Sequence, residues 1–326
     1  MPSAATGSSR GRRSAPGAPK LFWRAALGSA ERSCGPGVRG ASVPDYVLDH
    51  HLSGEGQRLA LMSRLLDPMH RRIDRLGVGP GARTLEVGCG NGSISAWLAE
   101  RVAPGGQAVA VDPDLSLADA DVPGLELRQG DICAGPVAPA DFDLVTARAV
   151  LHHVADAEAA VTNLVASARP GGAILLIEPD FLPVSIAEPP EIQAFWQGWL
   201  AWSREQGIDY FIGRRLPAAL ASRGLHDVGA TAETALYNGG SPWAVYWRET
   251  VIELRGRLVA SGKLDDRSID AFLAQCADPA WWTQTIAFTA VDGRIPETAG
   301  PERPESPGGN IRAPRGRELG ERCDDA

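Results

Sequence analysis

The stretch LEVGCGNGS, from Leu85 to Ser93, decides the fold of this chain. Its apolar beginning carries one acid, Glu86, and is typical of a short buried strand, while a helical pattern starts at Ser93. Between the two lies Gly88-Cys89-Gly90-Asn91-Gly92. Glycines at alternate positions let the backbone turn with positive φ and bring bare main chain against a ligand. The stretch therefore predicts a strand, a ligand-binding turn and a helix.

Short apolar runs alternate with helical patterns on both sides of this turn. A helix is expected over 54–76, with Pro68 interrupting it, and further helices over 93–102 and 156–168. Strands are expected over 84–87, 107–111, 125–129, 144–147 and 173–177, the last one entered through a Pro170-Gly171-Gly172 turn. This order predicts an α/β protein with a doubly wound parallel sheet and helices on both faces.

The pattern changes after Pro179. Helices are predicted over 191–206, 212–223, 243–260 and 268–275, and strands over 228–237 and 283–291. We therefore expect four regions: a disordered basic leader (1–40), a ligand-binding core (41–180), the C-terminal part of the sheet with an aromatic helical lid (181–295), and a disordered tail (296–326).

Charge and cysteine content exclude several classes of function. Residues 41–295 contain 20 basic and 32 acidic residues, and an acidic body argues against a nucleic-acid partner. No stretch of 18 apolar residues exists, so we expect no membrane span. The five cysteines are scattered without C-x-x-C spacing, which indicates neither a disulfide framework nor a metal site and favours a cytoplasmic protein.

The acid before the turn and the G-x-G-x-G spacing resemble motif I of the class I S-adenosylmethionine (SAM) dependent methyltransferases. Four later segments resemble that family in the same order: AVAVD ending at Asp112, Gln129-Gly130-Asp131-Ile132, the run Asp141–Val154 with its His152-His153 pair, and Arg169–Pro179. The resemblance covers about residues 46–180 and is close to small-molecule and quinone-biosynthesis members. It implies a Rossmann-like, seven-stranded sheet, here enlarged by a helical insertion that forms a lid.

The resemblance also implies how SAM would be bound. Main-chain groups of the turn would meet the methionine tail, Asp112 the ribose diol, and Asp131 the adenine amine. Tyr46 precedes the first helix, as a tyrosine does in related enzymes, where it closes over the cofactor. The complete set of expected cofactor-binding residues is Tyr46, Glu86, Gly88, Cys89, Gly90, Asp112, Pro113, Asp131, Ile132, Ala147 and Arg148.

One departure from the family pattern concerns the region between the second and third strands. Asp131 follows Asp112 by only 19 positions, which leaves room for at most two helical turns. We expect this short connection to loosen or expose the adenine edge of the site.

Methyl transfer is an in-line displacement in which the protein positions the acceptor, and a base is needed only when the acceptor must lose a proton. His152 and His153 are the candidate catalytic residues, although either could instead pack at a helix junction. Ile192, Phe195, Trp199 and Trp202 form an aromatic stripe that is either core or a wall of an acceptor cavity. We therefore expect a small, apolar or aromatic acceptor under the lid.

Two other kinds of function stay open from the residues. A protein that binds SAM without turnover would carry the same turn and acids. An NAD(P)-dependent oxidoreductase would need a third glycine at the position of Ser93, which weakens that interpretation. A methyltransferase that modifies proteins is a further alternative. The aromatic insertion argues against it, because it predicts an enclosed site.

Overall fold

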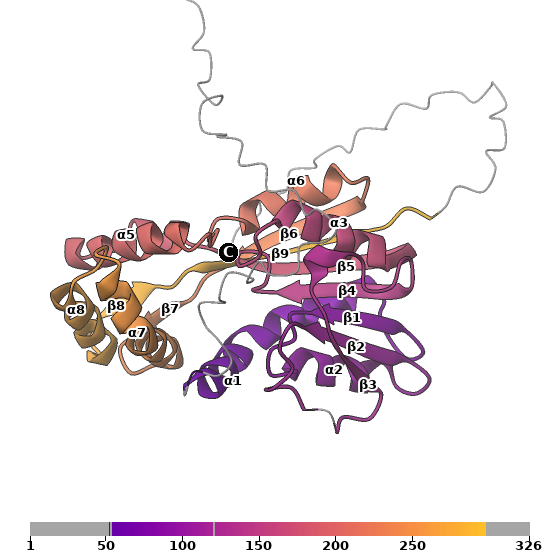
Figure 1. Cartoon of the computed structure of the whole chain (residues 1–326), viewed down its shortest axis with the longest axis horizontal. Helices are drawn as coiled ribbons and strands as arrows, with labels where there is room; N and C mark the ends of the chain where they lie inside the picture. Colours follow the sequence, from indigo (N-terminus) through magenta and orange to yellow (C-terminus); the bar gives the residue numbers. More distant parts are fainter. Residues whose placement is uncertain (1–51, 53, 120, 298–326) are drawn as a thin grey trace, which may run out of the picture. The chain divides into compact units, whose positions relative to one another are not determined.

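A computed structural model of the chain describes residues 52, 54–119 and 121–297 (Figure 1). The expected leader and tail, and Tyr46 with them, lie outside the described residues. Within the described part, no helix is both long and apolar enough to cross a membrane.

The main sheet has seven strands in the order β3-β2-β1-β4-β5-β9-β6. Strands β1 to β5 are parallel neighbours, while β9 runs antiparallel to both β5 and β6. The predicted α/β, Rossmann-like architecture is therefore confirmed. The strands are β1 (Arg83–Val87), β2 (Gln107–Asp112), β3 (Leu125–Gln129), β4 (Phe142–Arg148), β5 (Ala168–Asp180), β6 (His226–Glu233) and β9 (Ala287–Arg294).

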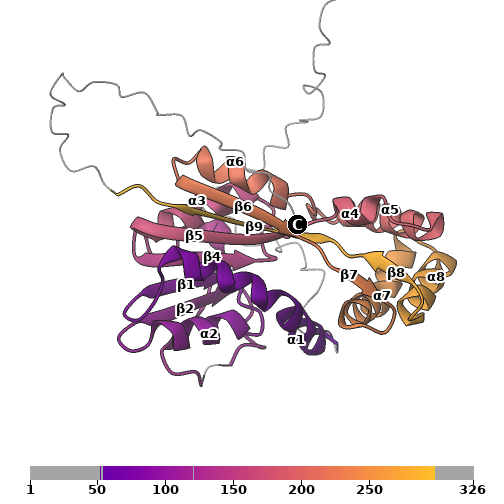
Figure 2. The same ribbon diagram turned by 180° about the vertical axis from the view of Figure 1, so that it is seen from behind.

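Helices cover both faces of this sheet (Figures 1 and 2). Alternate residues of β5 enter opposite cores, because successive side chains of a strand point to opposite faces: Leu175 joins the core with α2 and α5, and Leu176 joins the core with α3 and α6. The α-helices are α1 (Glu55–Leu66), α2 (Ser93–Val102), α3 (Ala157–Ser167), α4 (Leu182–Ser185), α5 (Pro190–Glu205), α6 (Leu216–Ala221), α7 (Pro242–Ala260) and α8 (Asp266–Ala277). The 3₁₀ helices of the described residues are η1 (Asp67–Leu76), η2 (Ile132–Ala134) and η3 (Gly213–Arg215).

Three expected boundaries differ in the structure. The helix expected over 54–76 is α-helical only to Leu66 and continues as the 3₁₀ helix η1, since Pro68 has no N–H with which to extend the α-helical ladder. The expected turn Pro170–Gly172 is an irregularity inside β5, which starts at Ala168. Between β2 and β3, the described residues form no helix, in keeping with the short connection.

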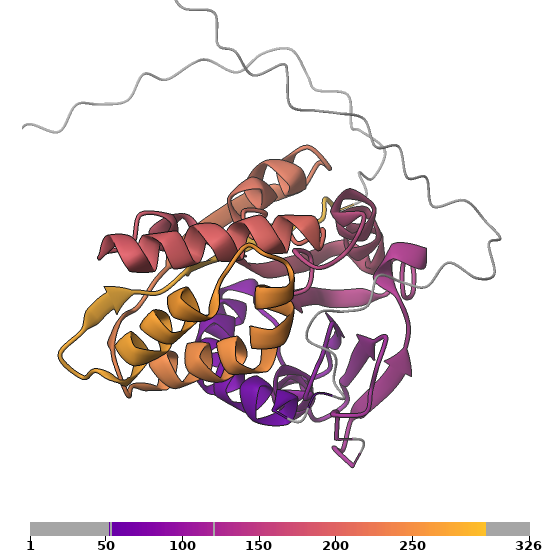
Figure 3. The ribbon, with the colours of Figure 1, turned by 60° about the vertical axis from the view of Figure 1, so that its left-hand side comes forward.

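The two predicted C-terminal strands each divide into two. Residues beyond β6 and before β9 form β7 (Leu236–Asn238) and β8 (Trp282–Gln284), which pair with each other as an antiparallel ribbon. The backbone N–H of Thr285 donates to Ala235 O at 2.9 Å and joins the ribbon to the main sheet. Helices α7 and α8 lie between β7 and β8 in the sequence, so the expected helical insertion is carried by this ribbon (Figure 3).

Aromatic rings fill the space between α5, α7 and α8. Phe195 stacks on Phe272 with ring centroids 4.0 Å apart, and Trp196 meets Trp247 edge-on at 4.8 Å. The indole N–H of Trp247 donates to Thr285 Oγ1 at 3.0 Å, which fastens α7 to the base of the ribbon. Most of the aromatic stripe predicted on α5 is therefore core.

Candidate active site

The glycine turn follows β1 and leads into α2. Gly88, Gly90 and Gly92 have φ of 73°, 53° and 75°, a region that side chains other than glycine rarely adopt. A Cβ atom on Gly88 would lie 2.1 Å from Val150 Cγ2, so this position has no space for a side chain. The spacing of the turn is therefore required both by backbone conformation and by close packing against the segment after β4.

Glu86 lies beneath the turn and is 2 % exposed. Its carboxyl group accepts a hydrogen bond from Ser95 Oγ on α2, which connects the strand to the helix that follows the turn. Burial raises the pKa of Glu86 to about 7, and the Ser95 hydrogen bond acts in the opposite direction. Glu86 therefore holds the two arms of the turn together from below.

Asp112 ends β2 beside the turn. One carboxylate oxygen accepts the Gly90 N–H at 3.0 Å, and the other accepts the Asp114 N–H at 3.0 Å. The side chain is 7 % exposed. A carboxylate oxygen has more than one acceptor position, so both oxygens can still accept a hydroxyl group. Asp112 thus orders the turn and remains able to bind a diol.

The end of β3 adjoins the end of β2. The N–H of Gly130 donates to Asp112 O at 3.1 Å, and Gln129 Nε2 donates to Pro113 O at 2.7 Å. Asp131 is exposed and accepts the Cys133 N–H at 2.8 Å, while Ile132 is buried. The structure therefore brings the expected ribose and adenine residues to the same edge of the sheet as the turn.

The remaining expected cofactor residues lie at the turn and at the end of β4. Cys89 is buried in the turn, and Ala147 is fully buried in β4 beside Val87. Arg148 is 7 % exposed, and its Nη1 lies 2.5 Å from Asp67 Oδ1 of η1. Arg148 thus fixes the segment before β1 against the end of β4, a contact that the sequence did not indicate.

The fit of this edge to SAM can be judged from its donors and acceptors. Three neighbouring strands, β1, β2 and β3, end in a side-chain-free turn, a carboxylate with spare acceptor positions, and a second carboxylate. Ligands of open α/β sheets bind at such carboxyl ends, and the N-terminus of α2 adds favourable amide dipoles for a carboxylate. These groups suit the ribose, the adenine amine and the methionine tail of SAM, so the residues present fit the cofactor.

His152 and His153 follow β4, with ring centroids 3.8 Å apart. His152 Nδ1 lies 2.7 Å from Glu178 Oε2 of β5, and Glu178 Oε1 accepts the N–H groups of Val150 and Leu151 at 2.8 and 2.7 Å. Burial lowers the pKa of His152 to about 3 and raises the pKa of Glu178 to about 8. The buried pair shares one proton in the Nδ1–Oε2 hydrogen bond, and when this proton lies on Nδ1, the Nε2 atom of the neutral ring is a proton acceptor.

A cavity of about 50 Å³ lies beside this pair. His152 and His153 line it together with residues of α1, α5 and α7, among them Arg58, Trp199 and Tyr246. Arg58 pairs with Glu55 at 2.6 Å, and its Nη1 donates to Tyr246 Oη at 3.2 Å. The lining of the cavity is thus mainly aromatic, and the buried guanidinium of Arg58 is already paired with Glu55 of the same helix.

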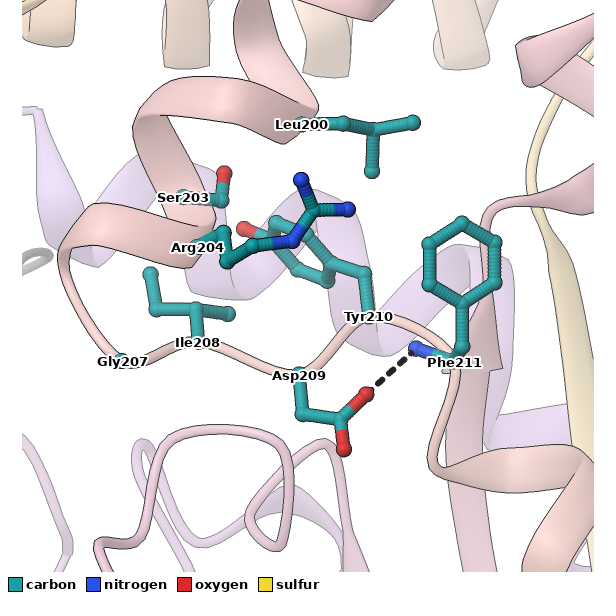
Figure 4. Close-up of a pocket in the computed structure, with 8 residues that line it drawn as sticks. All are labelled: Leu200, Ser203, Arg204, Gly207, Ile208, Asp209, Tyr210 and Phe211. Carbon is teal, nitrogen blue, oxygen red and sulfur yellow. Dashed lines mark hydrogen bonds between the residues drawn. The ribbon is translucent and has the colours of Figure 1, made fainter. Parts of the chain in front are cut away.

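Tyr210 connects this cavity with a wider pocket of about 350 Å³, because it lines both (Figure 4). Its ring stacks on Phe181 at 3.9 Å and lies 5.3 Å from His152. Asp209, which precedes Tyr210, accepts the Phe211 N–H through its carboxylate at 3.1 Å (Figure 4). Of the segment 207–211, which lines the wider pocket, Tyr210 alone also lines the cavity beside the histidines.

Several of these residues were not identified from the sequence. Glu178 could have been suspected, because an acid at the end of an apolar strand is unusual. Asp67, Arg58 and Tyr210 gave no signal, since their roles depend on partners far away in the chain.

Comparison with known proteins identifies a domain within the described residues. Residues 85–176 match the family model of the methyltransferase domain. An uncharacterized 37.1 kDa protein in transposon Tn4556 of Streptomyces fradiae is 31% identical over 123 residues, covering 36% of each chain. Demethylmenaquinone methyltransferase of Lactobacillus johnsonii is 28% identical over 134 residues, covering 38% of this chain and 53% of the relative. The chain thus spans about half or less of the length of these curated relatives.

Among solved structures, the YcgJ protein of Bacillus subtilis matches with a TM-score of 0.49 and 16% identity, over 70% of this chain and 98% of that one. The domain match and the sheet order give the class: residues 85–176 belong to a methyltransferase domain of the class I, SAM-dependent type. SAM is the cofactor of this family.

Proposed function

We propose that the protein transfers a methyl group from SAM to a small-molecule acceptor of the quinone-like or secondary-metabolite kind. The observation that carries this proposal is the cavity lined by Ala149, His152 and His153. These residues directly follow Ala147 and Arg148, which the family pattern puts beside the methionine end of SAM. The donor and acceptor sides of the reaction would thus meet at the end of β4. The demethylmenaquinone methyltransferase named above is one relative with a small-molecule acceptor in its name.

In this proposal the residues at the ends of β1, β2 and β3 hold the cofactor. Amides of Gly88, Cys89 and Gly90 would bind the methionine tail, Asp112 the ribose hydroxyls, and Asp131 with Ile132 the adenine. When bound, SAM supplies a methyl group that carries its own electrophilic activation, so the protein needs no nucleophile. The chain contributes orientation and the exclusion of water.

His152 is the proposed proton acceptor for an acceptor group that must be deprotonated. Its lowered pKa keeps the ring neutral, and Glu178 fixes its orientation through Nδ1. His153 lines the same cavity, and its pKa is also lowered, first by burial and then by the neighbouring His152. The cavity holds the volume of one or two water molecules, so a ring-sized acceptor enters when the elements around it move apart.

The same proposal excludes nucleic acid as the acceptor, because the acidic body offers little to a phosphate backbone. A cytoplasmic location is proposed with it. The scattered cysteines, none with C-x-x-C spacing, support a reducing compartment.

Binding of S-adenosylhomocysteine tests the cofactor assignment. We expect Asp112→Ala to weaken this binding by about 1.5–3 kcal/mol, the scale of hydrogen bonds to charged groups, in isothermal titration calorimetry. Asp114→Ala is the control and should bind as the wild type does. Equal affinity of Asp112→Ala and wild type, or a preference for NAD over S-adenosylhomocysteine, would contradict the assignment.

Transfer itself is tested with SAM labelled on the methyl group and a fractionated cell extract. Label should enter the fraction of small molecules. Label found only in protein or nucleic acid would refute the proposed acceptor class, and binding of SAM without any transfer would favour a non-catalytic SAM-binding protein.

A further inference from the structure

The wider pocket lies where the chain turns back at the end of α5, and its volume is about 350 Å³. Gly207 has a φ of 78°, and the backbone N–H of Ile208 donates to Ser203 O at 2.9 Å, so the segment 207–211 turns back beside the last turns of the helix (Figure 4). Pockets that hold small molecules have volumes of about 300–1,000 Å³. The space between α5 and this segment is therefore large enough for a ring-containing ligand.

The walls of this pocket are largely apolar. Their apolar side chains are Leu200, Ile208, Tyr210 and Phe211. Leu200 and Phe211 are half-buried, so both keep apolar surface that a ligand can cover. Ser203 Oγ donates to Trp199 O at 2.8 Å, within its own helix. The pocket thus suits a molecule with an apolar body.

Arg204 brings a positive charge to this apolar space. It lies in the last turn of α5, is exposed, and extends its guanidinium into the pocket between Leu200 and Phe211 (Figure 4). Within the part of the chain that the structure describes, the Arg204 side chain forms neither an ion pair nor a hydrogen bond. The guanidinium is therefore available to a ligand.

The carboxylates closest to Arg204 in the sequence are engaged with other cations. Glu205 pairs with Lys263 at 2.6 Å, and Asp209 on the pocket wall pairs with Arg215. A single positive charge is thus left over at the pocket, although the chain as a whole has a net charge of −8. A singly charged anion balances it, and the planar fork of a guanidinium matches the two oxygens of a carboxylate.

We propose that this pocket binds a small monocarboxylate with a flat apolar body, whose carboxylate pairs with Arg204 and whose body lies against Leu200, Tyr210 and Phe211. This inference goes beyond the proposed function and does not depend on it. The site adjoins the histidine pair, because the Asp209 N–H donates to His152 O at 2.9 Å. A ligand in the pocket would therefore border the side on which the methyl acceptor is proposed to bind.

A pair of probes that differ in charge tests the inference. 3-Phenylpropanoate and 3-phenylpropanamide have nearly the same shape, but only the first carries a charge. Their affinities for the full chain are measured by isothermal titration calorimetry at neutral pH, without SAM. We expect the wild type to bind the carboxylate at least about threefold more tightly than the amide, the scale of an ion pair open to solvent, and Arg204→Gln to bind both about equally.

Arg64→Gln is the matched control. Arg64 is likewise an exposed arginine in the last turn of a helix, α1, but it does not line the pocket. This variant should keep the wild-type ratio of affinities. No preference for the carboxylate in the wild type, an unchanged ratio in Arg204→Gln, an equal loss of preference in both variants, or no binding of either probe would overturn the inference.

Salt supplies a second measurement that needs no variant. Raising the NaCl concentration from about 50 mM to about 500 mM screens exposed charges, so the preference of the wild type for the carboxylate should fall toward equality. A preference that does not change with salt would equally overturn the inference. Because SAM and S-adenosylhomocysteine are absent from these titrations, their outcome leaves the proposed function to its own tests.

Discussion

At the scale of single residues, Gly88 shows how closely the cofactor turn is built against the segment after β4. The position combines a positive φ with a neighbouring atom, Val150 Cγ2, that already occupies the place of a side chain. The turn therefore packs directly against the Val150 side chain, and no side chain at position 88 fits between them.

Gly88→Ala is expected to destabilise the protein by about 2–5 kcal/mol, because the strain of the left-handed conformation adds to overpacking. Adding Val150→Ala removes the clashing methyl groups and should restore about 1–3 kcal/mol of this loss, leaving the conformational strain. Urea denaturation of both variants checks the prediction. Val150→Ala alone serves as the reference, and a double variant no more stable than Gly88→Ala would show that the clash is unimportant.

Glu86 gives the fold a pH dependence. The pKa of this residue is about 7 in the folded chain and 4.5 for an unperturbed glutamate, so the folded state binds the proton more tightly than the unfolded state. The resulting stabilisation is fully present below pH 4.5 and is lost as the pH rises through 7. Glu86→Gln keeps a neutral group and lacks this dependence.

The stability difference between wild type and Glu86→Gln should therefore change by up to about 3 kcal/mol between pH 5 and pH 8, in the sense that the wild type loses stability at high pH. Urea denaturation across this range measures it. Because Glu178 is present in both proteins, its own titration cancels, and a difference that stays constant with pH would contradict the assignment.

The proximity of the candidate cofactor residues could be predicted from the sequence, because they lie at or just beyond the carboxyl ends of strands. Parallel strands bring their carboxyl ends to one edge, so the glycine turn, Asp112 and Asp131 are placed together by topology alone. The pairs His152–Glu178 and Arg148–Asp67 could not be predicted, since each joins separate elements through side chains. The unpaired guanidinium of Arg204 was equally hidden, because it depends on which of the neighbouring charges pair with other residues.

At the scale of elements, the sequence predicted the helices of the lid well and the adjoining strands less well. Alternating apolar residues over 228–237 and 283–291 indicated two strands, and each in fact divides between the main sheet and the β7–β8 ribbon. Periodicity reports which face of a strand is buried, but it cannot show that the pairing of β6 with β9 ends at Glu233 and that the pairing of β7 with β8 begins at Leu236.

The hydrogen bond from Trp247 to Thr285 is expected to stabilise the attachment of α7 to the ribbon. Thr285→Val keeps the volume but leaves a buried indole donor without a partner, so it should lower the free energy of unfolding by about 1–3 kcal/mol. Thr250→Val is the control, since Thr250 lies on α7 with Trp247 but donates to a carbonyl within that helix. Equal effects of the two variants in urea denaturation would refute the special role of the Trp247 bond.

At the scale of the whole described molecule, Arg72 links the segment before β1 to the far edge of the sheet. Its Nε donates to Asp292 Oδ1 at 2.6 Å across 220 positions of the sequence, and its Nη1 donates to Thr231 Oγ1 at 2.5 Å across 159 positions. The side chain is 8 % exposed. Arg72 therefore joins η1, which precedes the first strand, to β9 and β6, which are the last two strands of the sheet order.

Arg72→Met is expected to lower the free energy of unfolding by about 3 kcal/mol, because Asp292 is left as a largely buried charge without its partner. Arg72→Met with Asp292→Asn should be more stable than Arg72→Met, since the stranded charge is removed. Chemical denaturation of the set checks both statements. A double variant that is less stable than Arg72→Met would show that the polar contacts, and not the unpaired charge, dominate.

The β7–β8 ribbon connects the helices α7 and α8 to the main sheet. The chain enters the two helices through β7 and leaves them through β8, so the two points where this insert joins the sheet, Ala235 and Thr285, lie next to each other. An insert between these adjacent junctions does not interrupt the pairing of β9 with β5 and β6. In the proposed function, α7 lines the acceptor cavity, so a change of this insert would alter the acceptor side and leave the ends of β1, β2 and β3 unchanged.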